Sequence, residues 1–367
     1  VFSSYFHRSS VETSLDIFIS ISNTAMQITS FHKVDQVSVL QSSWKGSYNN
    51  AEPGKTNQVI KMRMKMMKRL AYLFCLASLF LWLQPTLLAA EEIPSEVKTV
   101  KVNGYDMSYV ERGSGAPVIF VHGSLSDYRT WLPILDDFSE SNRAISVSLR
   151  HYYPEKWDGR EGQISLQQHA DDMAVFIEKL NIGPVFLIGH SRGASVAMLM
   201  ASQHPQLTQG LILADPSPLA SMVPEDADLQ AAEKIRKELI ADIMKHYREG
   251  DTESGLRVFV NYVAGSDVWD KTPDEIRNVL RDNSWTLTSM QQDMETQFNC
   301  TNASSISAPV LLVTGDRSAS RYSSMHSGLE SCLSEVSKVT IADAGHMMFQ
   351  SNPTEFTFEV QYFISPQ

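Results

Sequence analysis

The stretch that decides the fold of this chain is PVFLIGHSRGASVAMLM, residues 184–200. It opens with four consecutive apolar residues (185–188) between a proline and a glycine, a pattern typical of a strand buried on both faces of a sheet. The small-residue turn GHSRG (189–193) and a helix-forming run (194–200) follow. A G-x-S-x-G turn between a strand and a helix is typical of a nucleophile elbow, which raises the hydroxyl of Ser191 above the sheet. The simpler alternative is a serine in an ordinary strand–helix loop, because the five-residue pattern is short.

The composition and charge of the chain limit the classes of function that it can have. The chain has 367 residues, of which 43% are hydrophobic, so it can form one large domain or two small ones. A formal net charge of -11 argues against general nucleic-acid binding. The sequence contains no Cys/His cluster with zinc spacing and no G-x-x-x-x-G-K-[ST] phosphate loop. We therefore expect no metal and no organic cofactor.

The segment 61–90 has the layout of a secretory signal peptide. A basic region is followed by an apolar core (70–83) and by small residues that end at Ala90. We expect cleavage and export to the periplasm or the medium. The alternative is that residues 70–88 form an uncleaved membrane anchor, although Gln84 and Pro85 interrupt this apolar run. We expect no other contact of the protein with a membrane.

Residues 1–60 differ in character from the rest. They are rich in Ser and Asn, and their apolar residues keep neither the helical nor the strand period for long. We expect this segment to be a non-native or disordered extension. Translation is then expected to begin at a methionine at the start of the basic region: Met62, Met64, Met66 or Met67.

Residues 91–367 predict strands alternating with helices. The expected strands are Val97–Val102, Tyr105–Val110, Pro117–Val121, Ala144–Leu149, 185–188, Gly210–Ala214, Val310–Thr314 and Lys338–Ile341. Between 217 and 301 the sequence is helix-forming without a clear strand. The pattern predicts an α/β fold with a mostly parallel central sheet, helices on both of its faces, and a helical insertion after the sixth strand. The core would comprise residues 91–216 and 302–367.

A possible catalytic triad appears in the order nucleophile, acid, base. Ser191 precedes Asp316, which follows a buried strand, and His346, which lies in the loop after the last strand. Both positions fall at the carboxyl edge of a parallel sheet, where such folds place their sites. The simpler alternatives are a turn-forming aspartate and a surface histidine. A second candidate acid is Asp215 at the end of the preceding strand, where Asp215-Pro216 could equally be a strand-ending turn.

Across residues 97–367 the sequence resembles the α/β-hydrolase fold superfamily. The motifs that carry the resemblance are HGSLSD (122–127), GHSRG (189–193), VTGD (313–316), and GH (345–346) followed by NP (352–353). The resemblance implies an oxyanion hole made by the backbone N–H groups of Ser124 and Arg192. It also implies that the helical insertion, residues 217–301, is a cap over the site, and that Asp215 occupies a position some members use for the acid.

The function implied is that of a capped, exported bacterial serine hydrolase. Ser191, deprotonated by His346 that is held by Asp316, would cleave a carboxylic ester of a small molecule through an acyl-enzyme. Alternatives within the same fold are a C–C bond hydrolase and a cofactor-free peroxidase. A non-catalytic ligand-binding member is a further alternative. No motif indicates the substrate or the oligomeric state.

The three cysteines agree with export. Cys75 lies in the predicted signal peptide, which leaves Cys300 and Cys332 in the mature part. An even pair in an oxidising compartment predicts a disulfide. The alternative is two buried free thiols.

Overall fold

The computed structural model describes residues 96–365, apart from 161–163, 218, 220 and 223–225. The predicted extension (1–60) and signal peptide (61–90) lie outside the described residues. Within these described ranges, no helix combines the length and the apolar composition that a membrane span requires.

The predicted strands form one eight-stranded sheet among the described residues. They are β1 (Lys98–Val102), β2 (Tyr105–Arg112), β3 (Ala116–Val121), β4 (Asn142–Val147), β5 (Val185–His190), β6 (Thr208–Ala214), β7 (Val310–Gly315) and β8 (Val336–Ile341). Their order across the sheet is β1-β2-β4-β3-β5-β6-β7-β8. The pairs β1/β2 and β2/β4 are antiparallel, and every other pair is parallel. The predicted fold class is confirmed.

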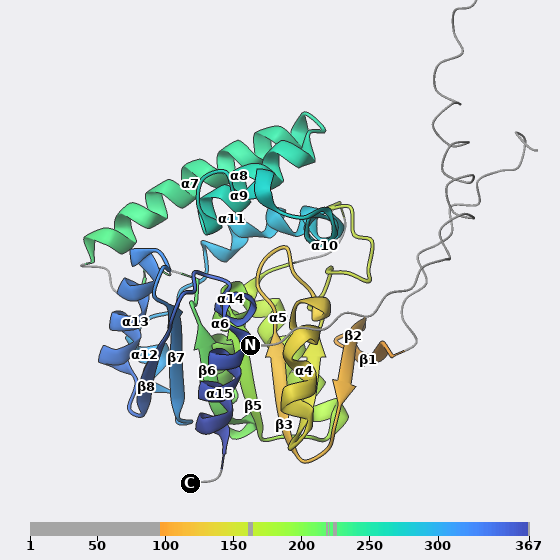
Figure 1. Cartoon of the computed structure of the whole chain (residues 1–367), viewed down its shortest axis with the longest axis vertical. Helices are drawn as coiled ribbons and strands as arrows, with labels where there is room; N and C mark the ends of the chain where they lie inside the picture. Colours follow the sequence, from red (N-terminus) through yellow and green to blue (C-terminus); the bar gives the residue numbers. More distant parts are fainter. Residues whose placement is uncertain (1–95, 161–163, 218, 220, 223–225, 366–367) are drawn as a thin grey trace, which may run out of the picture. The chain divides into compact units, whose positions relative to one another are not determined.

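Helices cover both faces of this sheet (Figure 1). In β3, Ile119 and Val121 pack into one apolar core, whereas Val118 and Phe120 pack into the other. Because both of their faces are buried, the central strands β3, β5, β6 and β7 have largely continuous apolar sequences, whereas the outer strands β1 and β8 alternate with polar residues. One core is closed by α5 (Leu166–Leu180), α6 (Arg192–Gln203), α12 (Cys300–Ser304) and α13 (Ser320–Cys332). The other is closed by the 3-10 helix η1 (Tyr128–Trp131), α4 (Leu132–Ser139), α14 (Met348–Ser351) and α15 (Pro353–Ile364).

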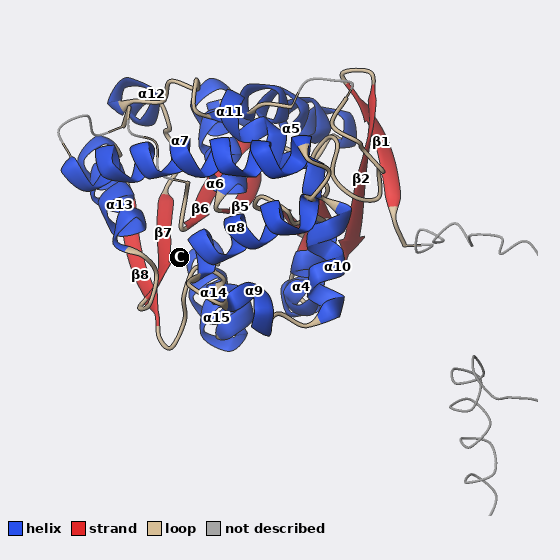
Figure 2. Cartoon of the chain, turned by 90° about the horizontal axis from the view of Figure 1, so that it is seen from above, coloured by secondary structure: helices blue, strands red, loops and turns tan. Residues whose placement is uncertain are grey.

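The segment between β6 and β7 forms the predicted helical insertion. Its helices are α7 (Ala227–Arg248), α8 (Thr252–Ala264), α9 (Val268–Lys271), α10 (Asp274–Asp282), η3 (Ser284–Ser289) and α11 (Met290–Asp293). They lie together beyond one edge of the sheet (Figure 1), and α7 and α8 cross above it in the view from above (Figure 2). α7 begins directly after Asp226, whose carboxylate accepts the N–H of Leu229 as an N-cap.

The insertion has an apolar core of its own, to which the loop after β3 contributes one residue. Tyr247, Leu256 and Trp269 belong to this core, and Leu125 of the loop after β3 packs into it. The insertion therefore helps to hold the loop that carries the neighbouring Ser124.

A disulfide joins Cys300 at the start of α12 to Cys332 at the end of α13, with their Cα atoms 5.1 Å apart. The predicted pairing is confirmed. The bond ties the exit of the insertion to the helix that follows β7.

Candidate active site

Ser191 occupies the sharp turn between β5 and α6. Its φ of 51° and ψ of -119° lie outside the regions that residues with a side chain usually adopt, at a cost of about 1–3 kcal/mol. The surrounding backbone holds this conformation, since the Ser191 N–H donates to the carbonyl of Ala214 at 2.9 Å. The following turn needs glycine at 193, because a Cβ there would overlap the carbonyl oxygens of Val121 and His122. This is the strand–turn–helix arrangement that the sequence predicts.

His346 is paired with Asp215. Its Nδ1 lies 3.2 Å from Oδ2 of Asp215, and both side chains are buried. The same carboxylate accepts the hydroxyls of Ser318 at 2.6 Å and Thr314 at 2.7 Å. These bonds hold the carboxylate in one orientation, and it in turn holds Nδ1 of His346 as the N–H donor. In that tautomer Nε2 is free to accept a proton.

The expected pairing of His346 with Asp316 is wrong. The Asp316 carboxylate accepts the backbone N–H groups of Asp343 and Ala344, both at 3.0 Å, and 43% of the side chain is exposed. Hydrogen bonding from the Asp343 N–H lowers the pKa of the Asp316 carboxyl below its usual value. Asp316 thus anchors the loop that leads to His346 and does not contact the ring.

Strand register explains why Asp215 and not Asp316 meets the histidine. Ala214 pairs with Val313, so Asp215 stands level with Thr314 and two residues short of Asp316. Two residues of strand correspond to roughly 7 Å, which is more than a hydrogen bond can span. The alternative acid considered from the sequence is the one that the fold presents to His346.

His346 packs against His190, the residue before Ser191, with the two ring centres 4.5 Å apart. Within the described residues no hydrogen bond joins Ser191 to the His346 ring, but His190, the residue before Ser191, donates from Nε2 to the His346 carbonyl at 2.8 Å. Burial lowers the pKa of His190 well below its ordinary value, so its ring is neutral. Catalytic hydrogen bonds are often long before substrate binds.

Tyr322 stacks on the base, a contact that the sequence did not indicate. The two rings are 4.5 Å apart and nearly parallel at 12°, and Tyr322 Oη is 3.4 Å from Nε2 of His346. In a parallel stack this oxygen lies above the imidazole plane, whereas the lone pair of Nε2 lies in the plane. The stack therefore leaves the lone pair of Nε2 available to the Ser191 hydroxyl.

The two predicted oxyanion-hole donors line the same cavity as Ser191. Within the described part of the chain, neither the Ser124 nor the Arg192 backbone N–H donates a hydrogen bond to another group. Arg192 is the first residue of α6, where helix N–H groups have no partner within the helix. Both amides can therefore bind a developing oxyanion.

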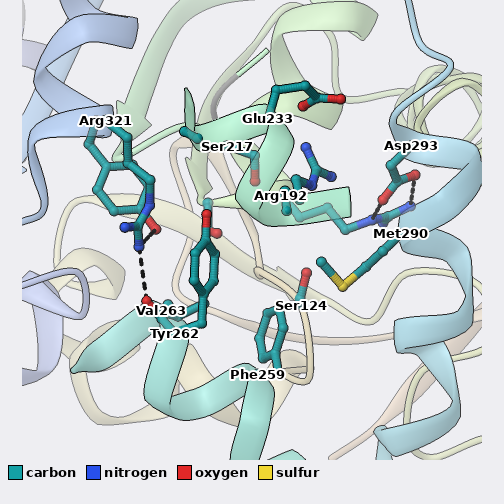
Figure 3. Close-up of a pocket in the computed structure, with 14 residues that line it drawn as sticks. Ser124, Arg192, Ser217, Glu233, Phe259, Tyr262, Val263, Met290, Asp293 and Arg321 are labelled. Carbon is teal, nitrogen blue, oxygen red and sulfur yellow. Dashed lines mark hydrogen bonds and ion pairs between the residues drawn. The ribbon is translucent and has the colours of Figure 1, made fainter. Parts of the chain in front are cut away.

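The cavity has a volume of about 50 Å³ and lies between the sheet and the insertion (Figure 3). It is lined by Ser124, Ser191, Arg192, Ser217, Arg321 and Tyr322 of the core, by Ala232, Glu233 and Arg236 of α7, by Phe259, Tyr262 and Val263 of α8, and by Met290 and Asp293 of α11. The residues from the insertion belong to no motif. In the described ranges no group of three or more His, Cys, Asp or Glu side chains could hold a metal ion.

Arg192 also binds the insertion through its side chain. The guanidinium donates to both carboxylate oxygens of Asp293, at 2.6 and 3.0 Å, and to Nδ1 of His169 at 2.7 Å. All three side chains are buried. Burial lowers the pKa of His169 well below its usual value, so this ring accepts as a neutral partner. From the sequence, the expected role of Arg192 was through its backbone N–H, and the contacts of its side chain with the insertion were not predicted.

Comparison with known proteins identifies the family. A model of the alpha/beta hydrolase family matches residues 118–360. The chain belongs to this family.

Individual members of the family are similar at low identity. The sn-1-specific diacylglycerol lipase ABHD11 of Mus musculus is 22% identical over 272 residues, which cover 68% of this chain and 80% of the mouse protein. The 2-(acetamidomethylene)succinate hydrolase of Mesorhizobium japonicum is 28% identical over 146 residues, 40% of this chain and 51% of that enzyme. Among solved structures, the enol-lactonase from Burkholderia xenovorans has a TM-score of 0.60 at 16% identity and covers 73% of this chain and 100% of its own. At these identities the solved structures establish the fold alone.

Proposed function

We propose that this protein is a serine hydrolase that cleaves a carboxylic ester of a small molecule through an acyl-enzyme on Ser191. The observation that carries the proposal is the convergence at one cavity. Ser191 and two uncommitted backbone amides line it, and the adjacent His346 is oriented by the buried Asp215. Similarity to proteins named as a diacylglycerol lipase and a 2-(acetamidomethylene)succinate hydrolase supports hydrolysis.

The chemistry follows from these positions. His346 Nε2 removes the proton from the Ser191 hydroxyl as its oxygen attacks the ester carbonyl carbon. The N–H groups of Ser124 and Arg192 stabilise the oxyanion, and each such donor is worth about two to three orders of magnitude in rate. The imidazolium, stabilised by Asp215, then protonates the leaving alcohol and the C–O bond breaks.

Deacylation uses the same groups. Water loses a proton to His346 and attacks the acyl carbon, and the carboxylic acid product leaves as Ser191 regains its proton. The insertion acts as a cap that excludes bulk water and supplies substrate contacts.

A fluorophosphonate probe and 4-nitrophenyl esters test the proposal. Labelling and ester hydrolysis are expected in the wild type and should be lost in Ser191→Ala. The matched control is Ser195→Ala, one helical turn away, which removes another buried hydroxyl and should leave both signals. A folded wild type that neither reacts with the probe nor hydrolyses any ester would instead be a non-catalytic ligand-binding protein.

We further propose that the mature protein is exported, with the disulfide between Cys300 and Cys332 as support, since such bonds persist in oxidising compartments. N-terminal sequencing of the native protein should find a first residue near Glu91. A chain that retains residues 70–88 and requires detergent for extraction would indicate the membrane-anchored alternative. A cytoplasmic protein with two free thiols would contradict export.

A further inference from the structure

Arg321, the second residue of α13, places its guanidinium at the wall of the Ser191 cavity (Figure 3). The guanidinium carbon lies 4.6 Å from the ring centre of Tyr262 and 4.8 Å from that of Tyr322. Cation–π contacts of this kind hold a guanidinium in place and leave its N–H groups at the edge free to bind.

The hydrogen-bonding capacity of Arg321 is largely unused. One terminal nitrogen donates two long bonds, to the Tyr262 carbonyl at 3.3 Å and to Tyr322 Oη at 3.5 Å, although a guanidinium has five N–H donors. In the described part of the chain, no carboxylate lies within ion-pair distance of Arg321. Arg192 in the same cavity differs, because Asp293 neutralises it with two short bonds.

The cavity wall at Arg321 favours an anion. Of the two carboxylates in the lining, Asp293 is paired with Arg192, and Glu233 forms no ion pair with Arg321 in the described part of the chain. A guanidinium without a counter-charge at a cavity wall attracts negatively charged ligands.

The position of Arg321 relates it to the reaction. Tyr322 Oη is 3.5 Å from the Arg321 nitrogen and 3.4 Å from His346 Nε2, so these two nitrogens are at most about 7 Å apart. A carboxylate bound by Arg321 would therefore be close to an ester that Ser191 attacks. An acyl chain with about two or three carbons between its carboxylate and the scissile carbonyl suits this distance.

We propose that Arg321, held between Tyr262 and Tyr322, binds a carboxylate of the substrate, so that the preferred substrates are esters that carry a free carboxylate on the acyl side. This inference rests on the proposed hydrolase function. The planar guanidinium matches a carboxylate with two parallel hydrogen bonds, which a lysine cannot provide.

The test compares 4-nitrophenyl hemiglutarate with the same compound whose free carboxylate is capped as a methyl ester. The wild type should prefer the free carboxylate, mainly through a lower KM. Arg321→Gln should lower kcat/KM for the anionic ester by about tenfold to a hundredfold and change the capped ester less than about threefold. Arg321→Lys should have a kcat/KM for the anionic ester between that of the wild type and that of Arg321→Gln. Arg257→Gln, which removes a charge from α8 outside the cavity, is the control and should leave the preference unchanged.

Two results would overturn the inference. One is a wild type without preference for the free carboxylate. The other is an equal decrease in kcat/KM for both esters in Arg321→Gln and in Arg321→Lys. That result would mean that Arg321 only stabilises the structure, by linking α13 to the Tyr262 carbonyl. Either can occur while fluorophosphonate still labels Ser191, so this failure is distinct from failure of the proposed function. If no ester is cleaved, glutarate alone should still raise the unfolding temperature of the wild type and not of Arg321→Gln, and an equal rise in both would also overturn it.

Discussion

Replacing Asp215 by Asn should abolish most of the activity while leaving the fold intact. The Asp215 carboxylate is buried and accepts bonds from His346 Nδ1, Thr314 and Ser318. An amide of the same shape keeps its carbonyl oxygen for one hydroxyl but can turn its NH₂ group to Nδ1. That arrangement places the histidine proton on Nε2, where it blocks removal of the Ser191 proton.

The expected loss is about 10⁴-fold in kcat, as found when the acid of a serine triad becomes an amide. This corresponds to about 5.5 kcal/mol of transition-state stabilisation. The matched variant is Asp316→Asn. That carboxylate is partly exposed, accepts hydrogen bonds from two backbone N–H groups and lies 4.0 Å from the Arg317 guanidinium. The change should therefore lower the free energy of unfolding only slightly and kcat by less than about tenfold.

Steady-state hydrolysis of a neutral 4-nitrophenyl ester measures kcat for both variants, and urea unfolding measures their stability. A loss of about 10⁴-fold in kcat is expected for Asp215→Asn. If this variant kept more than about a tenth of the wild-type kcat, the assignment of Asp215 as the acid would be refuted. A loss in Asp316→Asn as large as that in Asp215→Asn, without unfolding, would show that the loop rearranges and that Asp316 is the acid.

Two further predictions concern stability. His122 is buried, and burial lowers its pKa from 6.5 to about 4. Below pH 6.5 the His122 ring therefore binds a proton in the unfolded chain, whereas in the folded chain it stays neutral down to about pH 4. The free energy of unfolding consequently falls as the pH is lowered from 6.5 to 4, by about 1.4 kcal/mol per pH unit from this group. Urea unfolding between pH 5 and 8 should show a shallower slope in His122→Gln, and an unchanged slope contradicts the reasoning. Asp293→Ala leaves Arg192 buried without a counter-charge and should lower the free energy of unfolding by about 3–5 kcal/mol, whereas the double variant Arg192→Met/Asp293→Leu should lose less. If Asp293→Ala were as stable as the wild type, the ion pair between Arg192 and Asp293 would not contribute to the stability of the fold.

Local sequence determined the sheet, the strand–turn–helix at Ser191, and the residues that we propose as nucleophile and base, Ser191 and His346. Strands buried on both faces are continuously apolar, so β5 and β6 can be predicted from their own sequences without information on long-range contacts. Gly189 is required by contacts within the turn itself, because a Cβ there would overlap the backbone of Gly193 and Ala194. Gly193 is required by the neighbouring strand, whose Val121 and His122 carbonyls leave no room for a side chain. Elimination of Cys75 left one disulfide pairing, and the structure contains it.

Tertiary structure alone decided which carboxylate pairs with His346 and which residues line the cavity. Asp215 and Asp316 both follow buried strands, and only the register of β6 against β7 and the path of the loop before His346 select the first. The insertion folds around its own apolar core, and the polar residues that it turns towards Ser191 follow no period or motif. Arg192 and Asp293 are 101 residues apart in the chain, and a contact at that separation is specified by the packing of whole elements rather than by any local pattern.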